Sequence, residues 1–234
     1  MTTARSIYRR VRRVVRRAAG RDIQFPVQIE VPTATYGTEY GAWSICPRGL
    51  GRDSVVYSAG IGTDISFDLA LIEHYGVRVH AFDPTPASIA WLEAQRLPDR
   101  YTWQQVGLAA YDGQATFSPP DKPEHISHTM LPRAETGDRA IHVDVRRVTT
   151  LMRELGHERL DVLKMDIEGA EYDVVADILA AGIDIGQLLI EFHHRFSEVG
   201  IEPTRKAVTV LNEAGYHIFF ASDSGEEYGF MRQP

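Results

Sequence analysis

The stretch VVYSAGIGTDISF, residues 55–67, decides the fold. Val55–Ser58 is apolar enough for a buried strand, and a helix is predicted from Thr63 onward. Gly60 and Gly62 lie between the two, where glycine permits a tight turn and lets the backbone approach a ligand closely. The N-terminus of the helix that follows offers free N–H groups to an anion. The stretch therefore predicts a nucleotide-binding loop between a strand and a helix.

On both sides of this stretch the chain alternates between predicted strands and helices. Strands are expected at Val55–Ser58, Val77–Phe82, Tyr101–Val106, Leu160–Met165, Gln187–Phe192, Tyr216–Ala221 and Tyr228–Arg232, and helices at Thr63–Tyr75, Pro86–Gln95, Val148–Leu155, Ala170–Ala181 and Pro203–Ala214. Such alternation predicts an α/β fold with a mainly parallel sheet and helices on both faces. No helix separates the last two strands, so at least one should pair antiparallel at the sheet edge.

Two segments interrupt the alternation. Residues 22–50 are expected to be irregular, because prolines and closely spaced glycines are frequent there. Residues 111–140 contain four prolines, which exclude a long helix. A long loop in a compact domain is usually a lid or a binding element, so the 111–140 loop is expected to control access to a bound substrate. His125 and His128 are its candidate contacts.

Composition and charge restrict the class of protein. The chain has 234 residues, 44% of them hydrophobic, which suits one domain. The net charge is −7, but residues 1–21 carry eight arginines and no acidic residue, which leaves −15 for residues 22–234. A body this acidic argues against nucleic acid as the main partner. Cys46 is the only cysteine, which excludes a disulfide framework and favours a cytoplasmic location.

Residues 1–21 are predicted to form a basic amphipathic helix ahead of a domain at 22–234. Five apolar residues recur at about helical spacing, and arginines fill most of the other positions; the apolar set is Ile7, Val11, Val14, Val15 and Ala18. The helix could dock on an anionic membrane surface, which would make the protein a peripheral membrane protein. It could instead pack on the protein's own acidic body or be a frayed tail.

An acidic residue points to a nucleoside. Asp83 ends the predicted second strand, 21 residues after Gly62, where a carboxylate is placed to bind ribose hydroxyls. It could instead cap the next helix, since Pro84 and Pro86 follow. There is no third glycine, and Asp64 would stand near a pyrophosphate. An acid there suits a cationic group better, such as the amino end of S-adenosylmethionine.

Four stretches, VVYSAGIGTDISF, HAFDPTP, DVLKMDIEGAEYDVV and LLIEFHH, resemble the FkbM-type S-adenosylmethionine-dependent methyltransferases over roughly residues 35–220. The resemblance implies a Rossmann-like class I methyltransferase fold. It also implies methyl transfer to a hydroxyl oxygen, commonly on a sugar or a secondary metabolite. It carries over Asp166 with Glu168 as the site motif. The expected cofactor contacts are Gly60, Gly62, Asp64, Asp83, Pro84 and Gly107.

The reacting groups are expected where the parallel strands end. Lys164 and Asp166 close the predicted strand 160–165, and Glu191 and His193 close the next strand. Residues two apart point to the same side, so the four side chains could converge on one pocket. A hydroxyl is a weak acid and needs a general base or a metal ion. His193 is the first candidate for the base, with Asp166 second, and Lys164 is expected to keep Asp166 charged or to polarise the acceptor oxygen.

Alternatives remain for several of these residues. Asp166, Glu191 and His193 could together hold Mg²⁺ or Mn²⁺. Glu168 could bind backbone N–H groups of its own turn, and His194, on the opposite side of the strand, is expected to be structural or exposed. Two other functions also remain: a nicotinamide-dependent oxidoreductase and a non-catalytic ligand-binding member. The missing third glycine argues against the first, and the polar strand ends argue against the second.

Overall fold

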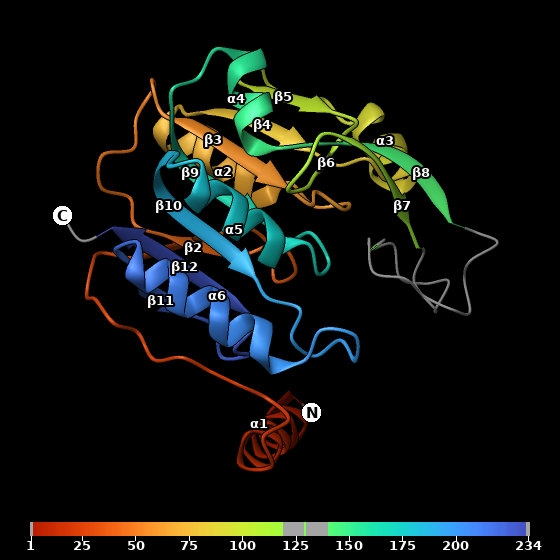
Figure 1. The fold of residues 1–234 in the computed structure, drawn as a ribbon. Helices are drawn as coiled ribbons and strands as arrows, with labels where there is room; N and C mark the ends of the chain where they lie inside the picture. Colours follow the sequence, from red (N-terminus) through yellow and green to blue (C-terminus); the bar gives the residue numbers. More distant parts are fainter. Residues whose placement is uncertain (1, 119–128, 130–139, 233–234) are drawn as a thin grey trace.

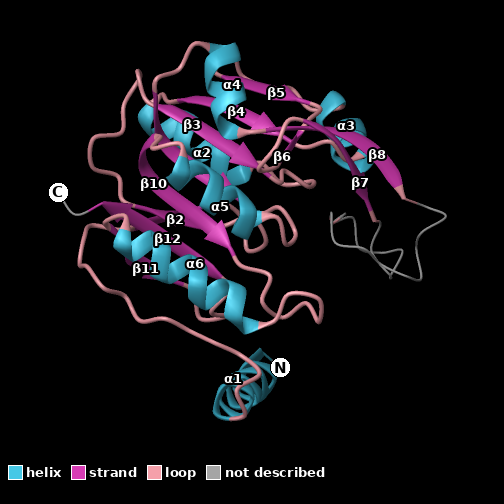
Figure 2. Ribbon diagram, viewed as in Figure 1, coloured by secondary structure: helices cyan, strands magenta, loops and turns pink. Residues whose placement is uncertain are grey.

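The computed structural model describes residues 2–118, 129 and 140–232. His125, His128 and most of the predicted loop at 111–140 therefore lie outside the described residues. In the part of the chain that is described, a central sheet is packed between helices on its two faces (Figure 2).

The central sheet has seven strands in the order β11-β12-β10-β9-β3-β4-β5. Their bounds are β3 Val55–Ala59, β4 Arg78–Phe82, β5 Tyr101–Gln104, β9 Arg159–Met165, β10 Asp184–Glu191, β11 Tyr216–Ala221 and β12 Glu227–Arg232. Strands β10, β9, β3, β4 and β5 run parallel, whereas β12 pairs antiparallel with both β10 and β11. The predicted parallel sheet with an antiparallel pair at one edge is confirmed.

Helices cover both faces of this sheet (Figure 1). Helices α4 Val148–Leu155, α5 Glu171–Ala180 and α6 Ile201–Glu213 pack on one face, and α2 Ser66–Tyr75 and α3 Pro86–Glu93 pack on the other. Along β3, Val56 belongs to the core under α2 and α3, while Tyr57 belongs to the core under α4, α5 and α6. Burial of both faces explains why the central strands are continuous apolar runs.

Two small sheets were not predicted. Strands β1 Ala34–Tyr36 and β2 Trp43–Ile45 pair antiparallel, so the prediction that all of 22–50 is irregular was wrong. Strands β6 Gly107–Leu108, β7 Gly113–Phe117 and β8 Ile141–Arg146 form a second sheet in the order β6-β8-β7. Residues 113–117 are therefore a strand and not a loop. The alternation in β8, IHVDVR, is the signal that was overlooked.

Residues 22–29, here called the edge strap, lie along the hairpin formed by β11 and β12. The backbone N–H groups of Gln28 and Ile29 donate to the carbonyl of Ile218 in β11, and the N–H of Ile218 donates to the Gln28 side chain. The Tyr228 hydroxyl of β12 accepts from the N–H of Phe25. Because β11 is the outermost strand on this side, the strap covers a sheet edge that would otherwise be unpaired.

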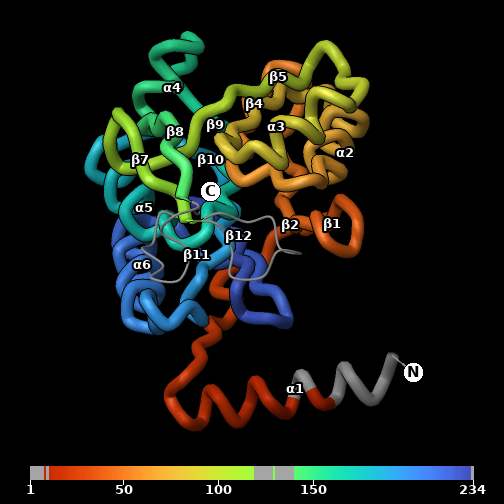
Figure 3. The backbone as a smooth tube through the Cα atoms, turned by 90° about the vertical axis from the view of Figure 1, so that its right-hand side faces the viewer, coloured from red at the N-terminus to blue at the C-terminus, as the bar shows by residue number. Residues whose placement is uncertain are grey.

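Helix α1, Thr2–Ala18, lies outside the layers of the body and precedes the edge strap (Figures 1 and 3). Figure 3 shows it running along one side of the molecule, away from the central sheet. Among the described residues, no helix is both long and apolar enough to cross a membrane.

Candidate active site

The glycine loop follows β3 and touches the end of β9. The backbone of Gly60 has a φ of +76°, a value that favours glycine, and a Cβ atom on Gly60 would lie 1.7 Å from the carbonyl oxygen of Asp166. The N–H of Asp166 in turn donates to the carbonyl of Ala59 at 3.1 Å. Glycine at position 60 therefore allows the backbone at the end of β3 to lie against Asp166, the first residue of the predicted site motif.

Asp83 holds the glycine loop in place. One oxygen of its buried carboxylate accepts from the backbone N–H groups of Ile61 at 2.9 Å and Gly62 at 3.1 Å. The other oxygen accepts from the backbone N–H of Thr85 at 2.9 Å and from its hydroxyl at 2.6 Å. Four donors match the roughly four lone-pair sites of a carboxylate. The glycine loop and Thr85 thus occupy Asp83 in this conformation, α3 has no side-chain cap, and the predicted contact of Asp83 with ribose stays a prediction.

One pocket opens against the glycine loop. It is lined by five of the predicted cofactor contacts, namely Gly60, Gly62, Asp83, Pro84 and Gly107. Leu108 and Phe117 add apolar surface to its lining. A Cβ atom on Gly107 would lie 3.2 Å from the ring of Phe117, so glycine leaves this wall open. Part of this pocket therefore has an apolar lining.

A second pocket borders the same loop and reaches the ends of β9 and β10. Gly60, Gly62 and Asp166 line both pockets, while Asp64 and Glu191 line only the second. Although burial raises the pKa of Asp64, hydrogen bonds from Ser66 and Thr38 hold that pKa below its usual value. Asp64, the sixth predicted cofactor contact, is therefore an anionic group in the second pocket, which adjoins the first pocket.

Lys164 supports the loop from the neighbouring strand. Its ammonium group donates to the carbonyl oxygen of Gly60 at 2.8 Å and lies 5.2 Å from the ring centroid of Trp43. Among the described ion pairs none joins Lys164 to Asp166, which feels the lysine only as a nearby charge. Lys164 thus contacts the glycine loop directly and does not donate to the predicted base.

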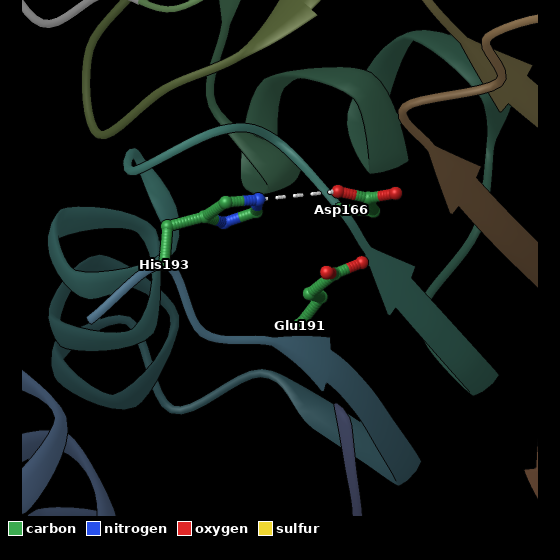
Figure 4. A group of neighbouring side chains, drawn as sticks. All are labelled: Asp166, Glu191 and His193. Atoms are coloured by element: carbon green, nitrogen blue, oxygen red, sulfur yellow. Dashed lines mark ion pairs between the residues drawn. The ribbon is translucent and has the colours of Figure 1, made fainter. Parts of the chain in front are cut away.

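Asp166, Glu191 and His193 converge at the ends of β9 and β10 (Figure 4). Each offers one ligand atom, and these atoms all lie within 4.8 Å of one another. The Nε2 atom of His193 lies 3.6 Å from Asp166 Oδ1 and 3.4 Å from Glu168 Oε2. The spacing of two residues therefore brought the expected carboxylates and imidazole together, with Glu168 beside them.

Glu171, which the sequence analysis missed, orients this group. Its fully buried carboxylate accepts from the backbone N–H groups of Ile167 and Gly169 at 3.0 Å and binds Nδ1 of His193 at 2.9 Å. The turn-binding role considered for Glu168 thus belongs to Glu171. A carboxylate in the first turn of α5 is the signal that could have identified it. When Nδ1–H donates to Glu171, the Nε2 lone pair faces Asp166 and Glu168.

Glu168 occupies a special backbone position in the same turn. It is the one non-glycine residue in the described ranges with a positive φ, +54°. Its carbonyl accepts a hydrogen bond from the hydroxyl of Thr129, the single described residue within the gap at 119–139. Thr129 also bridges to Ser118 at the end of β7. The segment predicted to control access thus touches the site at Thr129, and its control over a substrate stays a prediction.

The sequence was compared with known families and proteins. The model of the family described as the methyltransferase FkbM domain matches residues 57–218. The chain belongs to this family. Its curated relatives include "Probable methyltransferase-like protein 24" of Homo sapiens, 27% identical over 161 residues, which cover 64% of this chain and 38% of that protein. They also include "31-O-demethyl-FK506 methyltransferase FkbM" of Streptomyces tacrolimicus, 25% identical over 72% of this chain and 75% of that protein.

The chain thus spans little more than a third of the human FkbM-family relative. Among solved structures, the fibrillarin of Aeropyrum pernix with bound S-adenosyl-L-methionine has a TM-score of 0.42 at 13% identity, covering 77% of this chain and 66% of that one. The predicted resemblance to the FkbM family is confirmed, and it supports S-adenosylmethionine as the cofactor. It argues against the nicotinamide-dependent alternative.

The electrostatics of this FkbM-family site differ from those expected for a free histidine base. Burial, reinforced by Asp166, raises the pKa of Glu191 to about 9. Burial lowers the pKa of His193, but Glu171, Glu168 and Asp166 outweigh it and raise that pKa well above its usual value. A histidine with a near-neutral pKa was therefore a wrong expectation. Burial also raises the pKa of Asp166.

His194 has the structural role that was expected. It is buried, and its Nε2 atom lies 2.8 Å from the buried carboxylate of Asp22 in the edge strap. Arg195 binds the other oxygen of Asp22 at 3.1 Å and also pairs with Glu226. These residues follow His193 directly, so they fix the chain where it leaves the candidate site.

Proposed function

We propose that this protein transfers a methyl group from S-adenosylmethionine to a hydroxyl oxygen of a small polyhydroxylated acceptor, a sugar, glycan or secondary metabolite. The observation that carries the proposal is the junction of two pockets at Gly60 and Asp166. One pocket has the shape and lining for a nucleoside. The other leads from the glycine loop to the ionisable ends of β9 and β10.

The residues present fit the cofactor. The part of the first pocket beside Pro84, Leu108 and Phe117 would take the adenine ring, and the anionic Asp64 would face the amino end of the methionine moiety. When bound, the cofactor supplies a methyl group already activated by the sulfonium. The protein then has to place the acceptor oxygen in line with that methyl group and remove the proton of the acceptor hydroxyl.

Removal of the hydroxyl proton would depend on a divalent cation held by Asp166, Glu191 and His193. Two carboxylates and an imidazole form a nitrogen and oxygen donor set that suits Mg²⁺ or Mn²⁺. Such a cation would supply positive charge that lowers the pKa of the acceptor hydroxyl, so that its proton could pass to solvent without a near-neutral base. Glu171 would keep Nε2 of His193 directed at the cation.

Two arguments support a hydroxyl as the acceptor group: the name of a relative and the chemistry of the site. The Streptomyces protein is named as a methyltransferase acting on 31-O-demethyl-FK506, a hydroxyl acceptor, and it matches most of this chain. O-methylation requires a site that lowers the pKa of the acceptor hydroxyl. An amine acceptor does not require this, because a protonated amine loses its proton at a much lower pH than a hydroxyl does.

The proposal is tested by measuring the rate of methyl transfer to a panel of sugars and hydroxylated metabolites. The protein is assayed as purified, after treatment with a chelator, and after Mg²⁺ or Mn²⁺ is added back. Chelation should abolish turnover and either ion should restore it. Asp166→Asn and Glu191→Gln should each lower turnover about 100-fold. Glu191→Gln, whose residue does not line the first pocket, should leave the affinity for S-adenosylhomocysteine unchanged. The exposed Glu202→Gln serves as a matched control.

Two results would contradict the proposal. Full activity after chelation, together with near wild-type turnover in both site variants, would remove this group of residues from the mechanism. Binding of a nicotinamide cofactor with no binding of S-adenosylhomocysteine in calorimetry would reject the cofactor.

A further inference from the structure

We propose that helix α1 docks on an anionic phospholipid bilayer through its apolar face. The apolar side chains of its described part are among the most exposed large hydrophobic groups of the protein: Tyr8 is 68% exposed, Val11 56%, Val14 58% and Val15 60%. At 3.6 residues per turn these four positions fall within one arc of the helix. The described apolar side chains of α1 therefore form one exposed face.

The helix contacts its own protein with the opposite face. Arg13, Arg16 and Arg17 are partly buried, whereas the valines are not. A Cβ atom on Gly225, in the loop between β11 and β12, would lie 3.1 Å from the Arg17 guanidinium. An amphipathic helix that served only to complete the core would bury its valines and expose its arginines. Here the arrangement is reversed: three arginines are partly buried and the valines are exposed.

The positive charge around α1 extends onto the body. Arg12, Arg13 and Arg16 line a surface hollow together with Arg195, which follows the candidate active site. The one acidic residue lining this hollow, Asp22, is buried and already binds His194 and Arg195. The flank of the apolar face is thus a strongly cationic surface.

A lipid bilayer is the occupant that satisfies both faces. A second copy of α1 could cover the valines, but it would bring two segments together that each hold eight arginines and no acidic residue. Nucleic acid could bind the arginines, but it would leave the valines in water. An anionic bilayer offers phosphate groups to the arginines and acyl chains to the apolar face, with the helix lying in the plane of the interface.

Sedimentation of the full chain with lipid vesicles tests this proposal. The protein should bind mixed phosphatidylcholine–phosphatidylglycerol vesicles and bind phosphatidylcholine vesicles at least about 10-fold more weakly. Raising the salt concentration should weaken the first interaction. The double variant Val11→Asp with Val15→Asp should lose at least about 10-fold in binding to the mixed vesicles. Val27→Asp, which changes an exposed valine outside α1, should bind like the wild type.

Three outcomes would overturn the proposal. The first is no binding to the mixed vesicles, and the second is binding that the Val11→Asp with Val15→Asp variant retains. The third is a dimer in light scattering that this variant dissociates, because the apolar face would then belong to a helix–helix interface. Unchanged thermal midpoints for both variants would establish that any loss of binding is not a loss of folding.

Discussion

Asp83 shows how a single carboxylate can prepare a binding loop before the ligand arrives. Asp83→Asn replaces one acceptor oxygen by a donor, which would face the N–H groups of Ile61 and Gly62 or those of Thr85. We expect the affinity for S-adenosylhomocysteine to fall about 10-fold to 100-fold and the thermal midpoint to fall by several degrees. Calorimetry and thermal unfolding measure the two effects. Weaker binding with an unchanged midpoint would assign Asp83 to the ligand alone.

Glu171 acts on the candidate site through the His193 ring. Oε1 of Glu171 contacts both the N–H of Ile167 and Nδ1 of His193, so in Glu171→Gln an NH₂ group at that position would lose the Ile167 hydrogen bond and donate to Nδ1, while the amide oxygen could still accept from Gly169. The ring would then carry its proton on Nε2, which could no longer ligate a cation. We expect the affinity for Mn²⁺ to fall about 10-fold to 100-fold. Unchanged Mn²⁺ affinity in calorimetry would show that Glu171 only supports the turn.

His80, in β4, makes stability depend on pH. Burial first, and then the charges of His157 and Arg78, lower its pKa from the usual value to about 4. The unfolded chain takes up this proton near pH 6.5, so stability is fully present above pH 6.5 and is lost as the pH falls toward 4. The loss should be at most about 1.4 kcal/mol per pH unit.

His80→Phe tests that assignment. The new ring keeps the packing against Tyr57, whose ring centroid lies 5.6 Å away, but it cannot be protonated. Urea unfolding at pH 7 and at pH 5 should show a smaller difference in the free energy of unfolding than in the wild type. An equal difference would place the titration on another group.

At the scale of elements, the sequence predicted what strong patterns encode. Buried parallel strands are short apolar runs, so β3, β9 and β10 were located to within a few residues. Strands β7 and β8 were missed because they flank a segment whose prolines dominate the local pattern. The convergence of Asp166, Glu191 and His193 followed from strand order and side-chain parity alone.

Other features of the site depend on tertiary geometry that no spacing reveals. Which of Glu168 and Glu171 binds the turn depends on the left-handed backbone at Glu168. Parity placed Lys164 on the correct side of β9, but its length carries the ammonium group back to Gly60. The bonds that saturate Asp83 come from a loop and a helix start that are apart in sequence and meet only in the fold.

The edge strap is held to the body by a buried charged group. Asp22→Ala would leave His194 and Arg195 without their shared carboxylate in a site where Asp22 and His194 have no exposed side-chain surface. We expect the free energy of unfolding to fall by about 3 kcal/mol. Urea unfolding of this variant beside the exposed Asp53→Ala measures the difference. Equal stability of the two variants would show that the pair contributes nothing.

At the scale of the whole molecule, the charge divides between a cationic helix and an anionic body. A chain beginning at Asp22 keeps the edge strap and the Asp22 carboxylate, since both follow the helix. We expect its thermal midpoint to stay within a few degrees of that of the full chain. A shift larger than that would place α1 in the folded core.

A chain beginning at Pro32 should behave differently, because it lacks the edge strap. The N–H and carbonyl of Ile218, which now bind Gln28 and Ile29, would face water on an outermost strand. Exposed strand edges pair with one another, so this shorter chain should self-associate and aggregate as its concentration rises. Light scattering would follow that growth. The edge strap therefore protects the protein against aggregation. Its first residue marks how far the chain can be shortened from the N-terminus while the protein stays monodisperse.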